Sequence, residues 1–448
     1  MTSACIASSR LSRYHRIAWF VSGLVALAMH PCRAIDIDLW HALNGVAGDR
    51  LVELVAKFNG SQSEVRVLPQ YKGNPGDTLA SALAAVKGGE QPDLVQADES
   101  MTATLMADRT RIRPLYEVLA EGHEQLDVRA LLPGMASYYS ESVGKLAALP
   151  FNQSTALLYY NKDAFRAAGL DPAVPPRKWR DIQSMTLALQ KANASACGYA
   201  SDWQAWVHVE NLGAWHDEPF ATRSNGMDGP DARLTFNTTF MLRHVSLLSA
   251  WAHSGLFNYY GPGNQAESHF ISGECSIFTG SSGSLGAIDE RARFDYAIAP
   301  IPYYDEYDGA PFRSVIGGGA LWVMRGKPKA HYAAAAHFLA WLAKPEQQAA
   351  WHQATGFLPL SRSAYELTRK QGFYAQHPGY QIAIEELIGK SNNANGRGVR
   401  LLSLEKIRAV IDEELEHVWA HGKAPKDALD SAVARGNQLL QQLVASKR

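Results

Sequence analysis

The sequence predicts an α/β protein of two domains, and three observations lead to this fold class. Short apolar strands alternate with amphipathic helices after residue 34, which is the pattern of parallel βαβ units. The alternation is interrupted at "LPFNQSTALLYY", where Pro150 and Asn152 precede a new strand, so we expect the chain to cross to a second domain there. The 448 residues, 46% of them hydrophobic, are sufficient for two or three domains.

The first domain is expected to begin with three strands and two helices. The strands are predicted at 36–43, 64–71 and 93–98, and the helices at 49–61 and 76–92. In the first helix, apolar residues recur at helical spacing as far as Phe58, and Gly60 ends the pattern. Because ligands bind at the carboxyl ends of parallel strands, we expect the loops "YKGNPGD" and "QADES" to lie near a binding site.

The remaining elements are indicated by the same kinds of signal. Helices are predicted at 177–193, 241–255, 329–356 (a pair), 404–422 and 425–447, and strands at 154–160, 197–201, 276–284, 294–304 and 315–324. Gly422 ends one of the last two helices and Pro425 begins the other. The segment "VIGGGALWVM" is interpreted as a second crossover leading into a strand, and "GFLPLSRSAYE" as a third connection.

Residues 1–34 are interpreted as a secretory signal peptide. Three arginines precede the apolar run "IAWFVSGLVALAM", and "HPCRA" offers a cleavage site after Ala34. The run is too short to span a bilayer comfortably. A lipid anchor on Cys32 is the alternative, but "MHP" lacks the small apolar residues that such processing needs. We therefore expect a soluble protein exported to the periplasm.

Charge and cysteine content restrict the partners. The signal peptide carries four arginines and no acid, so its removal lowers the formal charge from −1 by four, to −5. This argues against nucleic acid, which requires a basic face. Cys197 and Cys275 remain after cleavage; they could pair in an oxidising compartment or stay free, and without a CxxC motif they are a poor metal site.

The sequence offers little for catalysis. It contains no HExxH motif, no G-x-S-x-G elbow and no Walker A motif, and "GSSGSLG" lacks the lysine of a phosphate loop. Glu413, His417 and His421 share a helical face, which is either solvated or part of a metal site; we favour the solvated face. We expect no enzyme activity, no catalytic residue, no metal and no cofactor.

Signals for binding are stronger. "TGSSGSLGAI" places Ser281 and Ser282 before a helix, where they could contact an anion or simply cap the helix. The three glycines of "VIGGGALW" permit either close approach of backbone to a ligand or a bend.

Three tryptophans lie close together in "SDWQAWVHVENLGAW". Trp203 and Trp206 would be side by side on a helix, either as stacking surfaces for a polyol or sugar or as ordinary packing. Arg408, next to Ile407, is either a solvated flank or an anion clamp in a cleft.

Long stretches of the chain resemble the sn-glycerol-3-phosphate-binding components of ABC importers, within the extracellular solute-binding family that includes maltodextrin binders. The matching stretches are "YKGN", "LPFNQSTALLYYNKDAFRAAGLDP", "CGYASDWQAWVHVENLGAW", "GECSIFTGSSGSL", "IGGGALWVM", "LAKPEQQAAWHQATGFLP", "AYELTRKQGFY" and "IRAVIDEELEHVW". They are far more specific than a short motif, and they extend over nearly the whole chain after residue 34.

The resemblance implies a two-lobed periplasmic binding protein fold with three interlobe crossovers and a ligand cleft between the lobes. On this basis residues 35–150 form the first part of lobe 1 and 151–312 the first part of lobe 2. Residues 313–358 return to lobe 1, and 359–448 are C-terminal helices that belong mainly to lobe 2.

The resemblance also implies ligand contacts. Glu99 corresponds to an acidic residue for glycerol hydroxyls, Gly318 to a backbone donor, and Arg408 to a phosphate clamp. Ser154 and Ser281 correspond to serines on the phosphate side. Trp203 and Trp206 correspond to tryptophans that flank the glycerol, whereas Trp215 is expected to be packing.

Two positions depart from the family pattern. Pro75 and Phe357 each replace a ligand-contacting tyrosine, and each lost hydrogen bond to a charged group costs about 1.5–3 kcal/mol unless it is replaced. Tyr71 or Asp98 could compensate, although Asp98 would repel phosphate. The pocket is therefore expected either to prefer a glycerophosphodiester or to bind glycerol-3-phosphate more weakly, and Phe357 stays a candidate ligand contact.

The expected function is capture of sn-glycerol-3-phosphate or glycerophosphodiesters by lobe closure, as a monomer, followed by delivery to the transmembrane permease subunits and cytoplasmic ATPase of an ABC importer. A neutral-sugar binder of the same fold is the nearest alternative. A secreted phosphodiester hydrolase and a partner of a chemoreceptor are weaker ones.

Overall fold

The computed structural model describes residues 34–142, 144–388, 393 and 395–445. Almost all of the predicted signal peptide therefore lies outside the described residues. Among the described helices, none is both long enough and apolar enough to cross a membrane.

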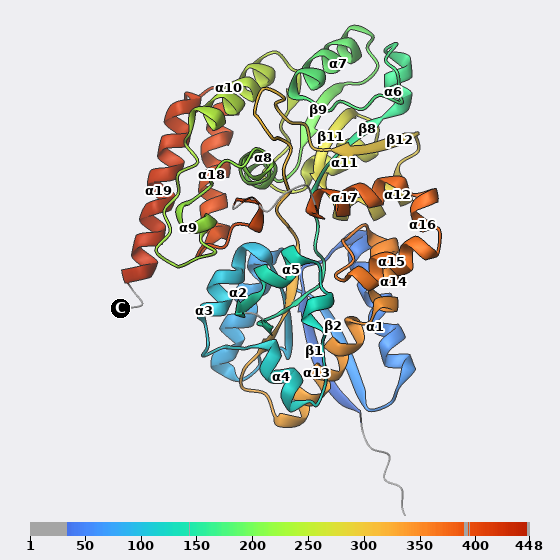
Figure 1. Cartoon of the computed structure of the whole chain (residues 1–448), viewed down its shortest axis with the longest axis vertical. Coiled ribbons are helices and arrows are strands. Elements are labelled where there is room, and N and C mark those ends of the chain that lie inside the picture. Colours follow the sequence, from blue (N-terminus) through green and yellow to red (C-terminus); the bar gives the residue numbers. More distant parts are fainter. Residues whose placement is uncertain (1–33, 143, 389–392, 394, 446–448) are drawn as a thin grey trace, which may run out of the picture. The chain divides into compact units, whose positions relative to one another are not determined.

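One sheet is built mainly from the N-terminal part of the chain (Figure 1). Its strand order is β2-β1-β3-β13-β4, and β7 also pairs with β13. The bounds are β1 Ile35–His41, β2 Val65–Tyr71, β3 Leu94–Asp98, β4 Ile112–Arg113, β7 Leu149–Pro150 and β13 Gly319–Met324. We call this sheet with its helices the first lobe.

The second sheet, with the helices packed on it, forms the second lobe. Its order is β10-β9-β11-β8-β12. The bounds are β8 Ala156–Asn161, β9 Cys197–Ser201, β10 Phe257–Asn258, β11 Cys275–Ser281 and β12 Tyr296–Pro300. A separate short hairpin joins β5 Ser140–Ser142 to β6 Lys145–Leu146.

Helices precede, separate and follow these strands. Before β8 lie α1 Gly45–Ser61, α2 Pro75–Ala85, α3 Thr102–Ala107, α4 Leu115–Glu121 and α5 Pro133–Tyr138. Between β8 and β13 lie α6 Lys162–Ala167, α7 Trp179–Lys191, a π-helix at Ala205–Asn211, α8 Leu212–Trp215, α9 Thr222–Asn225, α10 Thr239–His253, α11 Gln265–Ile271 and α12 Leu285–Arg291. After β13 come α13 Lys329–Leu342, α14 Pro345–Thr355, α15 Arg362–Lys370, α16 Phe373–Gln376, α17 Pro378–Ile388, α18 Leu404–Trp419 and α19 Pro425–Ala445.

The chain passes between the two sheets where the sequence changes character. It leaves the first sheet after β7 and enters the second at β8, and it returns between β12 and β13. Helices α13 and α14 pack on the first lobe, against α4 and α1, whereas α17 contacts β12 of the second sheet. Figure 1 shows α18 and α19 beside α10 of the second lobe, with which both are in contact.

The helices and strands form where hydrophobic periodicity places apolar side chains on one face. In α1, Leu51, Leu54, Val55 and Phe58 are buried, at the spacing of one helical stripe. Two large apolar clusters form the core: one contains Phe58 and Trp322 of the first lobe and continues to Tyr159 and Phe278 of the second sheet, and the other contains Trp179 and Trp251 of the second lobe. Burial of these side chains is the main source of fold stability.

The two strands that follow the crossings differ from the expected parallel arrangement. Strands β1, β2 and β3 are parallel, as predicted, but β13 runs antiparallel to β3, and β8 runs antiparallel to β11 and β12. A strand that arrives from the other lobe has no crossover helix of its own to set a parallel direction. Both strands are buried along their whole length, so each lies inside its sheet.

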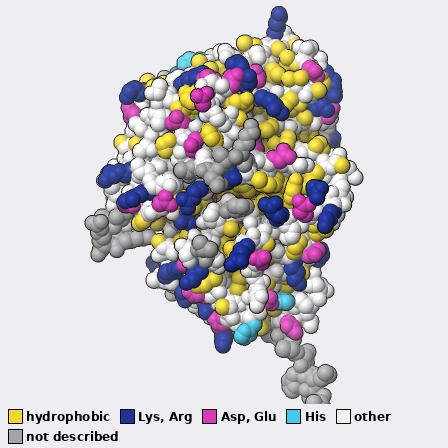
Figure 2. All heavy atoms as spheres, in the orientation of Figure 1, with side chains coloured by type: hydrophobic (Ala, Val, Ile, Leu, Met, Phe, Trp, Pro, Cys, Tyr) yellow, Lys and Arg dark blue, Asp and Glu magenta, His cyan; other side chains and the backbone are white. Residues whose placement is uncertain are grey.

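The surface carries charges of both signs. On the face drawn in Figure 2, basic and acidic side chains are interspersed. Such a surface lacks the continuous basic stripe that binding to a phosphate backbone requires on that face.

Candidate functional site

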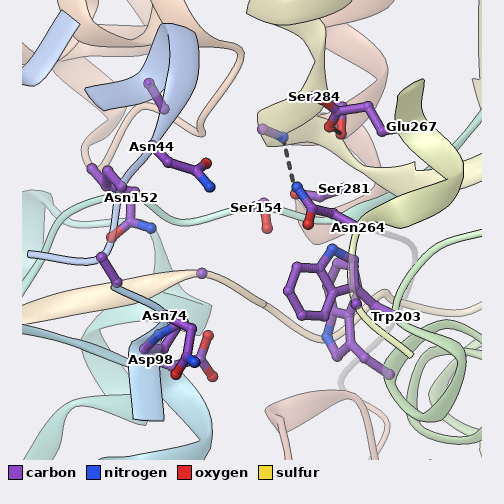
Figure 3. Close-up of a pocket in the computed structure, with 18 of the residues that line it drawn as sticks. Asn44, Asn74, Asp98, Asn152, Ser154, Trp203, Asn264, Glu267, Ser281 and Ser284 are labelled. Atoms are coloured by element: carbon purple, nitrogen blue, oxygen red, sulfur yellow. Dashed lines mark hydrogen bonds between the residues drawn. The ribbon is translucent and has the colours of Figure 1, made fainter. Parts of the chain in front are cut away.

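A cavity of about 930 Å³ is lined by residues of both lobes (Figure 3). From the first lobe it receives the loops that follow β1, β2 and β3, which is the strand edge where parallel sheets bind ligands. From the second lobe it receives segments around β9, β11 and α11 and one face of α18.

All eight residues predicted as ligand contacts line this cavity. They are Glu99, Ser154, Trp203, Trp206, Ser281, Gly318, Phe357 and Arg408. The structure thus brings together residues that are more than three hundred positions apart in the sequence. Their individual roles as ligand contacts remain predictions. Trp215 does not line the cavity and packs with Val207 and Ile301, in agreement with the expectation of a packing role.

Arg408 reaches the cavity, but not as a lone cation. Its Nε and Nη2 atoms donate to the two carboxylate oxygens of Glu210 at 2.6 and 2.8 Å. Nη2 also contacts Oε1 of Glu99 at 2.6 Å, and Nη1 lies 3.6 Å from Oδ1 of Asp98. The N–H groups of Nη1 are therefore the donors that this cluster leaves for a ligand. We call Arg408 with these three acids the arginine cluster.

The arginine cluster connects the two lobes. Arg408 is on α18 and Glu210 is on the π-helix, both in the second lobe, whereas Asp98 and Glu99 follow β3 in the first lobe. Burial alone would lower the pKa of Arg408, but Glu210 and Glu99 hold that pKa well above its ordinary value. The guanidinium is therefore always charged.

The acids around Arg408 respond to burial in the opposite direction. Burial raises the pKa of the Glu99 carboxyl well above its ordinary value, although Arg408 opposes the shift. On α18, Glu405 and Asp412 share the cavity face with Arg408, three and four residues away. Burial raises the pKa of Asp412 to about 7, against the opposing hydrogen bond from the backbone of Ala205.

Glu210 is the functional residue that the sequence reasoning missed. It is buried and does not line the cavity, so it can act on a ligand only through Arg408. The available signal was its position in the polar-aromatic segment 201–215, four residues after Trp206. The other polar residues of that segment are also used internally, since Gln204 accepts from Trp419 Nε1 and Asp202 accepts from the backbone of Ala266.

The two tryptophans of the cavity are held by different backbone conformations. Trp203 precedes the π-helix and has a left-handed φ of 49°, so the expected regular helix does not extend to it. Its side chain is partly exposed, and Figure 3 shows its indole on the wall opposite Asp98 and Asn74. Trp206, in the π-helix, is buried, and its Nε1 has no hydrogen-bond partner among the described residues. Such π-helical turns are frequent at functional sites.

The residues on the predicted phosphate side are fixed by backbone geometry. The Ser281 hydroxyl accepts from the backbone N–H of Gly283 at 3.0 Å while it also lines the cavity, so capping and ligand contact are compatible. Ser282 instead accepts from Thr155 and is buried. Gly318 has a φ of 89°, and a Cβ there would lie 1.8 Å from the carbonyl oxygen of Asn152, so only glycine fits.

The two positions that depart from the family pattern both face the cavity. Pro75 begins α2, and Tyr71 lies nearby at the end of β2 with an exposed ring. Phe357 is buried, stacks on Trp351 with ring centroids 5.8 Å apart, and brings no polar group to the cavity wall. Tyr71 thus brings a phenol to the lining of the cavity, whereas residue 357 brings none.

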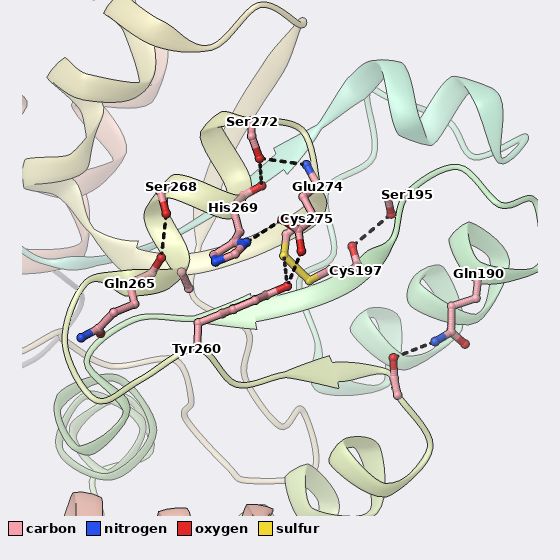
Figure 4. Close-up of a disulfide and its surroundings, with 12 residues drawn as sticks. Gln190, Ser195, Cys197, Tyr260, Gln265, Ser268, His269, Ser272, Glu274 and Cys275 are labelled. Atoms are coloured by element: carbon pink, nitrogen blue, oxygen red, sulfur yellow. Dashed lines mark hydrogen bonds and ion pairs between the residues drawn. A yellow bond between two sulfur atoms is a disulfide. The ribbon is translucent and has the colours of Figure 1, made fainter.

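Cys197 and Cys275 form a disulfide between β9 and β11, which resolves the alternative that the sequence left open (Figure 4). These strands are parallel neighbours, and their opposite ends lead to Trp203 and Ser281. The disulfide therefore fastens the two strands whose carboxyl ends carry cavity residues. Among the described residues no group of three or more His, Cys, Asp or Glu side chains could hold a metal ion.

Comparison with known proteins identifies the class of this chain. The family model of bacterial extracellular solute-binding proteins matches residues 53–381. The chain belongs to this family. Proteins of the family bind small molecules and work with the permease and ATPase subunits of ABC importers.

Two relatives show the branch of the family. The sn-glycerol-3-phosphate-binding periplasmic protein UgpB of Yersinia pseudotuberculosis serotype I is 42% identical over 96% of this chain and 97% of that protein. UgpB of Escherichia coli O6:H1 is 43% identical over 95% of this chain and 97% of that protein.

Solved structures agree on the two-lobed fold. UgpB from Mycobacterium tuberculosis in complex with glycerophosphocholine superimposes with a TM-score of 0.76 at 22% identity, over 91% of this chain and 99% of that one. Maltose-bound MalE3 of T. maritima superimposes with a TM-score of 0.71 at 16% identity, over 91% and 100%.

Replacement of Glu210 tests whether it anchors Arg408. Glu210→Gln keeps the shape of the side chain but removes the charge that both guanidinium donors face, so we expect unfolding to require about 1–3 kcal/mol less free energy. Urea denaturation measures this. Glu413→Gln on α18, which loses an exposed pair with Arg435 of α19, is the control and should leave the midpoint nearly unchanged. Equal effects of the two substitutions would contradict an anchoring role.

The raised pKa of Asp412 predicts that the stability of the protein depends on pH. Its carboxyl stays protonated in the folded protein up to about pH 7, whereas in the unfolded chain it loses its proton near its ordinary pKa of 3.8. Between these values the folded state binds more protons, so stability falls as the pH rises, by at most about 1.4 kcal/mol per pH unit. Asp412→Asn should reduce this slope in urea titrations from pH 4.5 to 7.5, where Glu99 and Glu267 also contribute, and the exposed Asp427→Asn should not. An unchanged slope in Asp412→Asn would contradict the raised pKa.

Proposed function

We propose that this protein captures sn-glycerol-3-phosphate and glycerophosphodiesters in the interlobe cavity and presents them to an ABC permease. The observation that carries the proposal is the charged Arg408, which lines the same cavity as Ser154 and Ser281 and whose Nη1, 3.6 Å from Asp98 Oδ1, is not held by Glu210 or Glu99. A guanidinium and hydroxyl donors are the groups that bind phosphate oxygens well. The relatives named above support the same ligand class.

The ligand would lie across both lobes. We assign the glycerol hydroxyls to Glu99, with the indoles of Trp203 and Trp206 against the C–H faces. The phosphate would accept hydrogen bonds from Arg408 Nη1 and from the hydroxyls of Ser154 and Ser281. Gly318 would add its backbone N–H, and the Phe357 ring would cover the apolar side.

Capture would proceed by lobe closure. A ligand that contacts Glu99 of the first lobe and Trp203 of the second makes its full set of contacts only when the lobes are closed, so binding favours the closed form. The permease would recognise that form, and ATP hydrolysis by a separate subunit would drive import. No bond is made or broken in the binding protein.

The proposal also covers the signal peptide, the boundaries between the lobes and the oligomeric state. Residues 1–34 would direct the chain to the periplasm, where the relatives reside, and be removed there. We place the limits between the lobes near residues 150, 312 and 358. The first two fall between strands of different sheets, β7 and β8 and then β12 and β13. We propose that the mature protein acts as a monomer.

Pro75 and Phe357 favour diesters over the monoester. Both positions lack a phenolic hydroxyl that could donate a hydrogen bond to the additional charged oxygen of a phosphomonoester dianion. Asp98 sits at the edge of the arginine cluster and adds negative charge. We therefore expect sn-glycerol-3-phosphate to bind more weakly than a diester.

A neutral sugar is the second candidate, favoured by the two cavity tryptophans and by the fold shared with maltose binders. Replacing Arg408 by Lys distinguishes the two candidate ligands, because Lys retains the charge of Arg but not its planar, two-pronged hydrogen-bonding group. Arg408→Lys should weaken phosphate ligands by at least about tenfold. It should leave a neutral sugar nearly unaffected.

Calorimetric titration tests this function. The purified protein should bind sn-glycerol-3-phosphate and glycerophosphocholine, should lose affinity for both in Arg408→Lys, and should ignore maltose. Arg435→Lys on α19, where Arg435 pairs with Glu413 and Glu414 of α18 and does not line the cavity, is the matched control and should leave affinity unchanged. Heat from maltose alone would contradict the phosphate assignment and leave the fold intact. Release of free choline from glycerophosphocholine would reveal a hydrolase instead.

A further inference from the structure

One end of the cavity is not used by the proposed glycerol and phosphate contacts. In Figure 3, Ser154 and Ser281 lie in the middle of the cavity, with Asp98 and Trp203 toward one end. Asn44, Ser284 and Glu267 lie toward the other. A ligand whose glycerol and phosphate occupy the first end and the middle would leave this second end for whatever the phosphate carries. We call it the distal end.

The cavity has room for such a group. Its volume of about 930 Å³ is equivalent to about thirty water molecules, at ~30 Å³ each in the liquid. Glycerol phosphate alone is far smaller than that. The unused volume is continuous with the predicted phosphate position, because the same cavity is lined by Ser281 and by Glu267.

Glu267 provides an oriented carboxylate at the distal end. It lies on α11 from the second lobe, and its Oε2 accepts a hydrogen bond from the Ser284 hydroxyl at 2.6 Å. Burial raises the pKa of Glu267, and the hydrogen bond from Ser284 and the nearby Arg291 oppose that shift without reversing it. No second protein donor to the carboxylate is found among the described residues. It can therefore accept from a ligand as well.

Two asparagines of the cavity wall, Asn44 at the distal end and Asn264 beside Ser281, are also unused by the fold. Asn44 and Asn264 occupy the N-cap positions of α1 and α11, where a side-chain oxygen usually accepts from the helix backbone, yet neither makes a cap hydrogen bond. Asn74, at the start of α2, does cap its helix by accepting from Asp77 at 2.9 Å. Asn44 and Asn264 both line the cavity, and Figure 3 shows Asn44 pointing into it from the first lobe.

The charge of the whole cavity favours a ligand that brings a cation. Among the described residues that line it, the acids outnumber the bases: Asp98, Glu99, Glu267, Glu405 and Asp412 against Arg291 and Arg408. A phosphomonoester adds two negative charges to this excess. A diester with an ammonium headgroup adds one negative and one positive charge, and it can place the positive charge next to a carboxylate.

We propose that the distal end is a headgroup subsite, in which Glu267, with Asn44, binds the ammonium group of a glycerophosphodiester. The inference rests on the proposed function, since it requires the phosphate to lie near Ser154 and Ser281. The headgroup would be an ethanolamine, whose N–H groups can donate to the carboxylate, or a choline, which offers charge alone. Because Asn44 comes from the first lobe and Glu267 from the second, an occupied subsite would also assist closure.

Calorimetric titrations with four ligands distinguish the contribution of the headgroup subsite to affinity from that of the rest of the cavity. The four ligands are sn-glycerol-3-phosphate, glycerophosphoglycerol, glycerophosphoethanolamine and glycerophosphocholine. The protein should bind the two ammonium diesters at least about tenfold more tightly than glycerophosphoglycerol, whose headgroup is neutral. Glu267→Gln should reduce that advantage by about tenfold and leave the other two ligands within about twofold. Asn44→Ala should cause a smaller loss, confined to the diesters.

The controls make each outcome decisive. Glu385→Gln, an exposed substitution of the same kind away from the cavity, should change none of the four affinities, and a thermal melt checks that each variant is folded. If Glu267→Gln weakens only the ethanolamine ligand, the subsite recognises N–H donors. If the substitution weakens both ammonium ligands, the subsite recognises the positive charge. An equal loss for all four ligands, or no loss for any, would refute the subsite while the proposed function stands. A wild-type protein that binds none of the four would refute the proposed function itself.

Discussion

The ion pairs of Arg408 are the constraint on which the cavity depends. A buried guanidinium loses its hydration, at a cost of several kcal/mol, and is tolerated only where carboxylates replace the lost water. Glu210 does so with two hydrogen bonds from the π-helix, and Glu99 and Asp98 do so from the end of β3. Three segments that are distant in sequence are thereby fixed around one side chain. Glu210 takes up the Nε and Nη2 side of the guanidinium, so Nη1, which lies 3.6 Å from Asp98 Oδ1, is the group left for a ligand.

The same cluster explains why the cavity is selective rather than simply attractive to anions. Two arginines among five cavity carboxyls cannot produce a positive pocket, so a phosphate must be recognised by directed hydrogen bonds and not by bulk charge. Burial raises the pKa values of Glu99 and Asp412, which reduces the negative charge that the ligand meets. The headgroup end carries its own carboxylate, Glu267, away from the arginine cluster. A zwitterionic diester matches both ends at once.

Most of the fold could be predicted from the sequence, because helix and strand periodicity and Gly and Pro signals are local. Resemblance to the family then brought eight distant residues to one cavity. What could not be predicted depends on contacts between segments. The antiparallel direction of β8 and β13 follows from the interlobe crossings, and the partnership of Arg408 with Glu210 spans 198 positions. The π-helix at Ala205–Asn211 has no sequence signal that distinguishes it from an α-helix. The uncapped Asn44 looks like any other N-cap until its side chain is placed.

The most direct test of this account is a crystal structure of the protein with sn-glycerol-3-phosphate bound. The account predicts a phosphate oxygen within about 3.2 Å of Arg408 Nη1, with a second oxygen at the hydroxyl of Ser154 or Ser281. It also predicts that both hydrogen bonds between Arg408 and Glu210 persist. A phosphate bound elsewhere, with Nη1 still facing Asp98, would contradict the claim that this arginine is the anchor of the site.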